Sequence, residues 1–323
     1  MKTILITGIS GFVGGHFTQS LMNNNSDFII HGVSRSNPIW DFIQNRNQIL
    51  DSITFHQCDL LNTGKIQALI GDIQPDYILH LASFSSVAQS WKEPLASFLN
   101  NTNVFLNIVE SVRLQKLDTK ILSVGSSEEY GIVKESELPL TEEKNLAPAN
   151  PYAVARVSEE YLAQIYGRGY NLDICCTRSF NHIGPGQSDK FVVSSIAKQF
   201  AGIAINHKKP IIKIGAGSII RDFVDIEDVI AAYTAILENG ITGEVYNVCS
   251  GEGHSILDIV NILSDLSEIP ITIEQNTDLI RPIDNPILIG SYKKLHNDTG
   301  WTPTFTIEKS LEKIYNYWCN KLS

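Results

Sequence analysis

The sequence predicts an α/β fold in which a parallel sheet is covered by helices on both faces. Short runs rich in β-branched residues alternate with segments whose apolar residues recur at helical spacing. The strand runs are nearly continuous in hydrophobicity, which is typical of strands buried on both faces of a parallel sheet. With 323 residues and 43% hydrophobic content, the chain can fill the large core that such a fold needs.

The expected elements follow one another in a regular order. Six strands are expected at residues 3–7, 28–34, 53–58, 77–83, 120–126 and 172–178. Helices are expected at residues 11–23, 65–73, 97–113 and 150–167. After residue 180 the pattern changes, with helices expected at 191–205 and 227–237 and strands at 221–226 and 243–249. We interpret residues 1–180 as one domain and residues 181–323 as a smaller α/β lobe, interleaved with it, that closes over the sheet edge.

Charge and composition exclude several classes of function. The formal net charge of −10 argues against nucleic-acid binding, which needs a basic surface. No apolar run reaches the length of a membrane-spanning helix, and the amino terminus lacks the apolar region of a signal peptide. The five cysteines have no metal-binding spacing, so we expect buried thiols and no metal site. These features together predict a cytoplasmic protein.

A glycine-rich turn follows the first expected strand. Gly8, Gly11 and Gly14 lie in ILITGISGFVGGHF, between this strand and the first helix. Glycine alone allows the tight turn, the close approach of a pyrophosphate and the close contact of helix and strand. The helix that begins here directs its free N–H groups at the phosphates. The motif therefore predicts a dinucleotide-binding Rossmann domain with a doubly wound sheet.

The end of the second strand favours NADP(H) as the cofactor, with NAD(H) as the alternative. An NAD-binding domain usually carries Asp or Glu there to bind the ribose 2′-hydroxyl. This chain has Ser34, Arg35 and Ser36, which suit a 2′-phosphate. Asp59, just after the third strand, is expected to hydrogen-bond the adenine.

A tyrosine and a cation one helical turn apart lie in NPYAVARVSEEY, at residues 150–161. They are Tyr152 and Arg156, whose spacing places them on one face of the helix. A nearby cation stabilises tyrosinate, so the pair suits proton transfer to or from a sugar oxygen during hydride transfer. Lysine is the usual cation of such a pair, and Arg156 supplies the same charge as a planar fork. We expect the pair to be catalytic, with a rate that the altered shape can lower.

The whole set of motifs resembles the extended short-chain dehydrogenase/reductase family that modifies nucleotide sugars. TGISGFVG matches the cofactor fingerprint, HLAS the fourth-strand motif, and NPYAVAR the Tyr-x-x-x-Lys motif with its last residue changed. RSFNHIGPGQ, RDFVDIEDV, YNVCSG and LIGSYKKLHNDTGWTP extend the resemblance almost end to end. It is strongest to GDP-4-keto-6-deoxy-mannose reductases. The resemblance implies NADPH-dependent reduction of a C4 keto group to a GDP-rhamnose-type product, used for cell-surface polysaccharide.

The resemblance also implies a site, with the cofactor on the first domain and a GDP-linked sugar on the smaller lobe. The implied catalytic residues are Ser126, Glu128, Tyr152 and Arg156. The implied cofactor contacts are Gly8, Gly11, Phe12, Val13, Gly14, Ser34, Arg35, Asp59, Leu60, Leu81, Ala82, Ser83, Asn101, Tyr152 and Arg156. The implied substrate contacts are Ser85, Ser126, Asn181, Val192, Arg221 and Arg281. A homodimer through the helices that carry Asn101 and Tyr152 is expected.

The segment GSSEEYG, at residues 125–131, leaves other functions open. A nucleotide-sugar 4,6-dehydratase needs a carboxylate to remove the C5 proton, and Glu128 can supply one. Glu129 is expected to face away from Glu128, because neighbours in an extended chain point to opposite sides. A 4-epimerase is less favoured, since such enzymes retain NAD and the acid expected for NAD is absent. The alternative outside enzymes is a nucleotide-binding regulator, which the catalytic side chains at 126, 128 and 152 disfavour.

Overall fold

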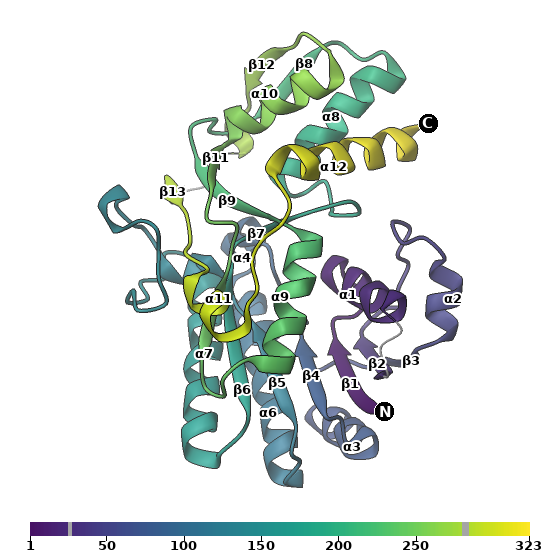
Figure 1. The fold of residues 1–323 in the computed structure, drawn as a ribbon, viewed down its shortest axis with the longest axis vertical. Helices are drawn as coiled ribbons and strands as arrows, with labels where there is room; N and C mark the ends of the chain where they lie inside the picture. The colour runs from purple at the N-terminus through teal and green to yellow at the C-terminus, as the bar shows by residue number, and fades with distance from the viewer. Residues whose placement is uncertain (25–27, 280–283) are drawn as a thin grey trace.

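A seven-stranded parallel sheet forms the centre of the protein and confirms the predicted fold class (Figure 1). The computed structural model describes residues 1–24, 28–279 and 284–323. The strand order is β10-β6-β5-β4-β1-β2-β3. The strands are β1 (Lys2–Thr7), β2 (Phe28–Ser34), β3 (Thr54–Gln57), β4 (Tyr77–His80), β5 (Lys120–Val124), β6 (Ile174–Ser179) and β10 (Val245–Val248). The order reverses between β1 and β4, which is where ligands bind in doubly wound sheets.

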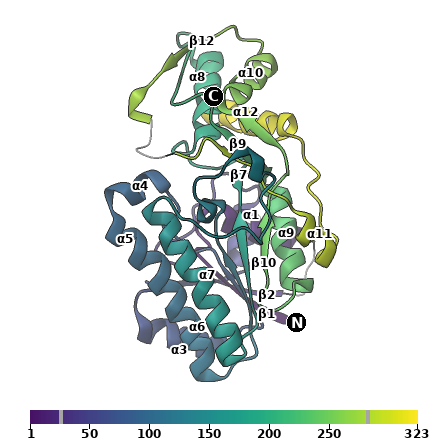
Figure 2. The same cartoon turned by 90° about the vertical axis from the view of Figure 1, so that its left-hand side faces the viewer.

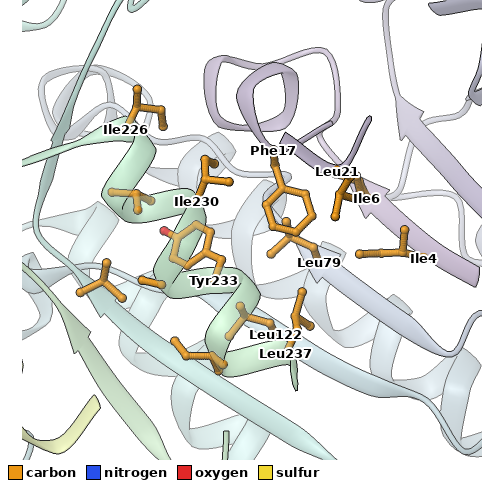
Figure 3. Close-up of a cluster of buried hydrophobic side chains, with 14 of the residues drawn as sticks. Ile4, Ile6, Phe17, Leu21, Leu79, Leu122, Ile226, Ile230, Tyr233 and Leu237 are labelled. Carbon is orange, nitrogen blue, oxygen red and sulfur yellow. The ribbon is translucent and has the colours of Figure 1, made fainter. Parts of the chain in front are cut away.

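Helices cover both faces of this sheet. On one face lie α1 (Phe12–Asn23) and α9 (Ile226–Asn239), and Figure 3 shows their apolar side chains meeting those of β1, β4 and β5. On the other face lie α3 (Thr63–Ile73), α6 (Val104–Gln115) and α7 (Pro151–Tyr170), seen side by side in Figure 2. Strand β1 serves both cores, because Ile4 and Ile6 face α1 and α9 while Leu5 faces the other layer. The continuous apolar run of this strand follows from that double burial.

The expected helix at 97–113 is instead three joined pieces. They are α5 (Pro94–Phe98), a π-helical turn η1 (Leu99–Asn103) and α6. Insertions of this kind leave no signature in apolar spacing and frequently occur at functional sites. Further short elements of the sheet domain were not expected. They are α2 (Arg46–Asp51), α4 (Val87–Lys92), η2 (Ser127–Tyr130) and η3 (Glu135–Glu137).

The remaining elements form a smaller lobe beyond the carboxyl ends of the strands, at the top of Figure 1. Its helices are α8 (Val192–Asn206), α10 (Ile256–Ser267) and α12 (Ile307–Leu322), which share one apolar core. Its four-stranded sheet contains β7 (Asn181–Ile183), β9 (Ile220–Asp225), β11 (Gly253–Ser255) and β13 (Ile287–Leu288). A two-stranded sheet pairs β8 (Ile211–Ile214) with β12 (Thr272–Gln275), which is followed by η4 (Thr277–Leu279). Helix α11 (Lys293–Thr299) returns to the large sheet, where β10 and α9 also belong.

Among residues 1–24, 28–279 and 284–323, no helix is both long and apolar enough to cross a bilayer. In the same residues, no group of three or more His, Cys, Asp or Glu side chains is arranged to hold a metal ion.

Candidate active site

The glycine turn joins β1 to α1 at the carboxyl end of a central strand. Gly8 has φ +69°, and a Cβ atom there would lie 2.8 Å from backbone atoms of Ala82. The Gly11 N–H donates to the Gly8 carbonyl at 2.9 Å, which closes the turn. A Cβ atom on Gly14 would lie 2.5 Å from the Ile9 carbonyl oxygen, so glycine lets α1 approach the turn. No described side chain caps α1, and its first N–H groups are therefore left for an anion.

The residues expected to select the cofactor lie at the ends of β2 and β3. A hydrogen bond joins the glycine turn to the end of β2, where the Gly8 N–H donates to the Val33 carbonyl at 2.8 Å. Ser34 is buried, and its hydroxyl donates to the Ser36 carbonyl at 2.7 Å. The Arg35 side chain is exposed. At the end of β3, Asp59 is exposed and Leu60 beside it is buried.

The loop after β4 passes over the glycine turn. Thr7 binds it at two points, since the Leu81 N–H donates to the Thr7 carbonyl and the Ala82 N–H to the Thr7 hydroxyl, both at 3.2 Å. Asn101, in the π-helical turn, is fully buried and supports the same loop, accepting the Phe84 N–H at 2.7 Å. Leu81, Ala82 and Asn101, three of the residues expected to bind the cofactor, thus lie in or against one loop.

Helix α7 carries the tyrosine–arginine pair into this region. Asn150 caps the helix, accepting the Ala153 N–H at 2.8 Å, so the pair lies in its first two turns. The Arg156 Nε donates to the Tyr152 hydroxyl oxygen at 3.3 Å, and its Nη2 donates to the Ser83 hydroxyl. Both the tyrosine and the arginine are buried. The guanidinium therefore joins the tyrosine to the loop after β4.

Glu159, one turn further along α7, completes this arrangement and was not expected. The Arg156 Nη1 donates to its Oε2 at 2.9 Å, and the two side chains are 4% and 3% exposed. Burial raises the pKa of Glu159 to about 7, against the opposing effect of the arginine charge. Burial would lower the pKa of Arg156, but the charges of Glu159 and Tyr152 raise it above its usual value. The sequence held one signal of this pair, the i,i+3 spacing of an arginine and a glutamate on a helix.

Ser126 and Glu128 follow the carboxyl end of β5, the strand that pairs with β4. The Ser126 hydroxyl oxygen accepts the Glu128 N–H at 3.3 Å and still has its own proton to donate. Glu128 is half-buried, and its Oε2 accepts from the Asn150 side-chain amide at 2.9 Å. That contact places a carboxylate at the start of the helix that carries Tyr152.

Glu129 does point away from Glu128, but the reason expected from an extended chain is wrong. Residues Ser127–Tyr130 form a 3₁₀ helix, in which Glu129 turns into the protein and becomes fully buried. Its Oε1 accepts the Ser126 N–H at 2.7 Å and so fixes the backbone of that serine. Burial and the neighbouring Glu160 carboxylate raise the pKa of Glu129 well above its usual range. The buried Glu129 carboxyl group therefore holds the backbone of Ser126 in place.

The residues expected to bind the substrate come from separate elements. Ser85 lies in the loop after β4, and Asn181 and Val192 begin β7 and α8; all three are exposed. Arg221 of β9 is buried, and its guanidinium donates to the Asp284 carboxylate at 2.6 Å. Arg281 lies outside the described residues. A ligand that touched all the described members of this set would span both lobes.

The sheet order, the glycine turn and the tyrosine–arginine helix define the class of protein as an extended short-chain dehydrogenase/reductase. A family model described as GDP-mannose 4,6 dehydratase matches residues 5–314. The chain belongs to this family.

Similar proteins of known structure or activity cover nearly the whole chain. GDP-6-deoxy-D-mannose reductase of Pseudomonas aeruginosa is 31% identical over 98% of this chain and 97% of its own. The structure of RMD from Pseudomonas aeruginosa complexed with NADPH is 31% identical, with a TM-score of 0.86 over 99% of this chain and all of that one. UDP-glucuronic acid 4-epimerase of Bacillus cereus, complexed with UDP-glucuronic acid and NAD, is 28% identical, with a TM-score of 0.85 over 99% of each chain.

Proposed function

We propose that this protein is an NADPH-dependent reductase of the C4 keto group of a GDP-4-keto-6-deoxy sugar, with a GDP-rhamnose-type product. The observation that carries the proposal is the Tyr152 hydroxyl, held by the Arg156 guanidinium at the carboxyl ends of β4 and β5. The likeness to GDP-6-deoxy-D-mannose reductase supports the choice of substrate. A reductase of this kind would supply an activated deoxy sugar for cell-surface polysaccharide, and we place it in the cytoplasm.

The glycine turn and the end of β2 fit NADP(H). Gly8 has no room for a side chain, so the backbone alone can face a pyrophosphate there. The uncapped N-terminus of α1 offers N–H donors to the same anion. Arg35 presents an exposed guanidinium where a 2′-phosphate would lie, and NADPH is the cofactor in the Pseudomonas aeruginosa structure. NAD(H), present in the Bacillus cereus structure, is the alternative.

The side chains at the site have distinct parts in the reduction. The reduced nicotinamide, when bound, supplies a hydride to the carbonyl carbon of the sugar. Tyr152 donates its phenolic proton to the carbonyl oxygen, which becomes the product hydroxyl. Ser126 donates a hydrogen bond to the same oxygen, and Arg156 stabilises the tyrosinate that remains. A proton from solvent then restores the phenol.

A 4,6-dehydratase is the second candidate, because Glu128 lies beside the start of α7 and is half-buried. Its carboxylate is the kind of group that removes a C5 proton after oxidation at C4. The two functions differ in the starting sugar, so product analysis separates them. Purified protein is incubated with GDP-mannose plus NADP⁺, and separately with the 4-keto-6-deoxy sugar nucleotide plus NADPH.

The reductase proposal predicts that only the keto sugar is converted, with oxidation of NADPH. Formation of a 4-keto product from GDP-mannose, abolished in Glu128→Gln, would instead assign the dehydratase function. Tight cofactor binding with neither conversion would assign the non-enzymatic role of a nucleotide-binding regulator.

We further propose that two copies of the chain associate through the outer face of α5, η1 and α7. These elements lie against one another at the surface, as Figure 2 shows for α5 and α7. Six large apolar side chains on them are 37% or more exposed: Leu95, Phe98, Leu99, Val154, Tyr161 and Ile165. The three on α7 follow an i, i+7, i+11 spacing and so form one stripe. A contiguous apolar surface of this kind marks a protein interface, and a second copy offers the same stripe.

A further inference from the structure

The guanidinium of Arg156 is held at three points. Its Nε donates to Tyr152, its Nη2 to Ser83 and its Nη1 to Glu159. Positions 152, 156 and 159 are spaced i, i+4 and i+7, so the three side chains stack along one face of α7. A planar fork fixed at one end can turn no further about its long side chain. Glu159 and Ser83 together therefore fix the plane of the guanidinium, with Nε toward the tyrosine.

The same glutamate changes the charge that the tyrosine experiences. A carboxylate 2.9 Å from the guanidinium, with both side chains buried, offsets much of the arginine charge at short range. An uncompensated cation stabilises tyrosinate, which suits a base that oxidises an alcohol. A cation that is only partly offset leaves the proton on the phenol before the reaction, and its remaining charge still stabilises the tyrosinate that forms when the proton is donated to a ketone.

We propose that Glu159 is a positioning residue that directs Arg156 toward Tyr152 and offsets part of its charge, so that Tyr152 holds its proton until it donates it during reduction. This inference rests on the proposed reductase function for its direction. It also accounts for an arginine at a position where the family motif has lysine, because a fork can bind a glutamate and a phenol together.

Other titratable groups face the pair from the elements packed around it. Burial lowers the pKa of His80 on β4 to about 3, so its imidazole stays neutral. Burial raises the pKa of Tyr233 on α9 and of the Cys176 thiol on β6. Burial also raises the pKa of Glu129 in the turn after β5, which favours its protonated form. Glu159, with a pKa of about 7, is ionised in the alkaline range in which a phenol would lose its proton.

A second buried ion pair lies nearby, between Arg178 and Glu160. Arg178 of β6 donates to both oxygens of Glu160, at 2.9 Å and 2.8 Å. Its charge is thus matched by its own partner, and the Arg156–Glu159 pair is the one that contacts the tyrosine.

The test is a titration of the Tyr152 phenol in the cofactor-free protein. Tyrosinate difference absorbance is recorded against pH for each protein, and the curve of its Tyr152→Phe counterpart is subtracted to isolate this phenol. In Glu159→Gln the phenol is expected to ionise about one pH unit lower than in the wild type. Glu159→Asp keeps the charge, and it is expected to lie between the two. An unchanged curve in Glu159→Gln, with the protein folded, overturns the proposal.

A matched variant separates the local effect from a general loss of negative charge. Glu110 pairs with Arg113 at 2.8 Å, also at i,i+3 spacing, near the far end of α6. Glu110→Gln is expected to leave the Tyr152 titration in place. An equal shift in this variant would show a general charge effect and would overturn the role of Glu159.

Turnover gives a second readout that distinguishes failure of this proposal from failure of the reductase function. In Glu159→Gln, the pH at which keto-sugar reduction declines on the alkaline side is expected to shift to lower pH, by as much as the ionisation of the phenol shifts, while KM changes little. A wild type that never reduces the keto sugar overturns the reductase function, yet the absorbance titration still decides the role of Glu159. An alkaline limb that stays in place while the phenol shifts would show that Tyr152 does not donate the proton.

Discussion

At the scale of single residues, the Tyr152–Arg156 pair decides whether this protein is a catalyst. The structure brings both side chains to the loop after β4, where the phenol accepts a hydrogen bond from Nε at 3.3 Å. A positioned acid of this kind contributes roughly 10²–10⁴-fold to turnover. We therefore expect Tyr152→Phe to lose that factor in kcat while the affinity for the nucleotide sugar changes little. Steady-state kinetics with the keto sugar and NADPH measures both quantities.

Substitutions of Arg156, the cation of the pair, are also expected to change turnover. Arg156→Ala removes the charge and the link to Ser83, so turnover should fall, whereas Arg156→Lys should retain activity or raise it. If Arg156→Ala were as active as the wild type at saturating cofactor, the pair would be structural and the site assignment wrong.

Cofactor choice is also expected to depend on one residue. Arg35 is exposed at the end of β2, and no acid follows that strand to bind a ribose 2′-hydroxyl. A charge-assisted hydrogen bond to a 2′-phosphate is worth about 1.5–3 kcal/mol. We expect Arg35→Ala to weaken NADPH binding by about that much and NADH binding far less, as measured by fluorescence titration with each cofactor. Equal losses for the two cofactors would show that Arg35 does not recognise the 2′-phosphate.

At the scale of elements, the sequence predicts the parts whose physics is local and repeats along the chain. The strands of the large sheet and helices α1, α3 and α7 lie where apolar spacing places them. The π-helical turn and the short strands of the smaller lobe could not be predicted, because two to five residues carry too little periodicity. Glu159 was missed for another reason. Its part depends on which helix face meets the loop after β4, and that is a tertiary fact.

The outer face of α5 and α7 gives a prediction at this scale. Ile165, at the C-terminal end of the apolar stripe on α7, is 60% exposed, and a dimer would bury it. A buried carboxylate without a partner strongly disfavours association, so Ile165→Glu should sediment as a monomer where the wild type sediments as a dimer. Ile241 is 53% exposed in the loop before β10, away from this face, and Ile241→Glu is the matched control. A wild type that is monomeric at micromolar concentration would contradict the proposed association.

At the scale of the whole molecule, buried ionisable groups make stability depend on pH in two opposing ways. Burial lowers the pKa of His182 to about 4 and raises that of Asp222 to about 6. A buried histidine contributes stability that is present above its ordinary pKa and lost as the pH falls through the folded value. A buried acid with a raised pKa has the opposite effect, since its contribution is lost as the pH rises. The net curve is therefore a sum, and single variants are needed to separate its parts.

His182 offers the clearest separation. Its Nε2 hydrogen-bonds the Tyr233 hydroxyl at 3.0 Å, and its Nδ1 has no partner among the described residues. Between its ordinary pKa of 6.5 and the folded value of about 4, the unfolded chain binds a proton that the folded protein does not. As the pH falls through this range, the free energy of unfolding of the wild type should therefore decrease relative to that of His182→Asn, by about 1.4 kcal/mol per pH unit. Urea unfolding of both proteins near neutrality and at about pH 5 measures the difference, with His207→Asn as the control, because that imidazole is exposed at the end of α8. A difference between wild type and His182→Asn that stays constant with pH would mean that the folded protein admits the proton, and that the environment of His182 is polar enough to hold a charge.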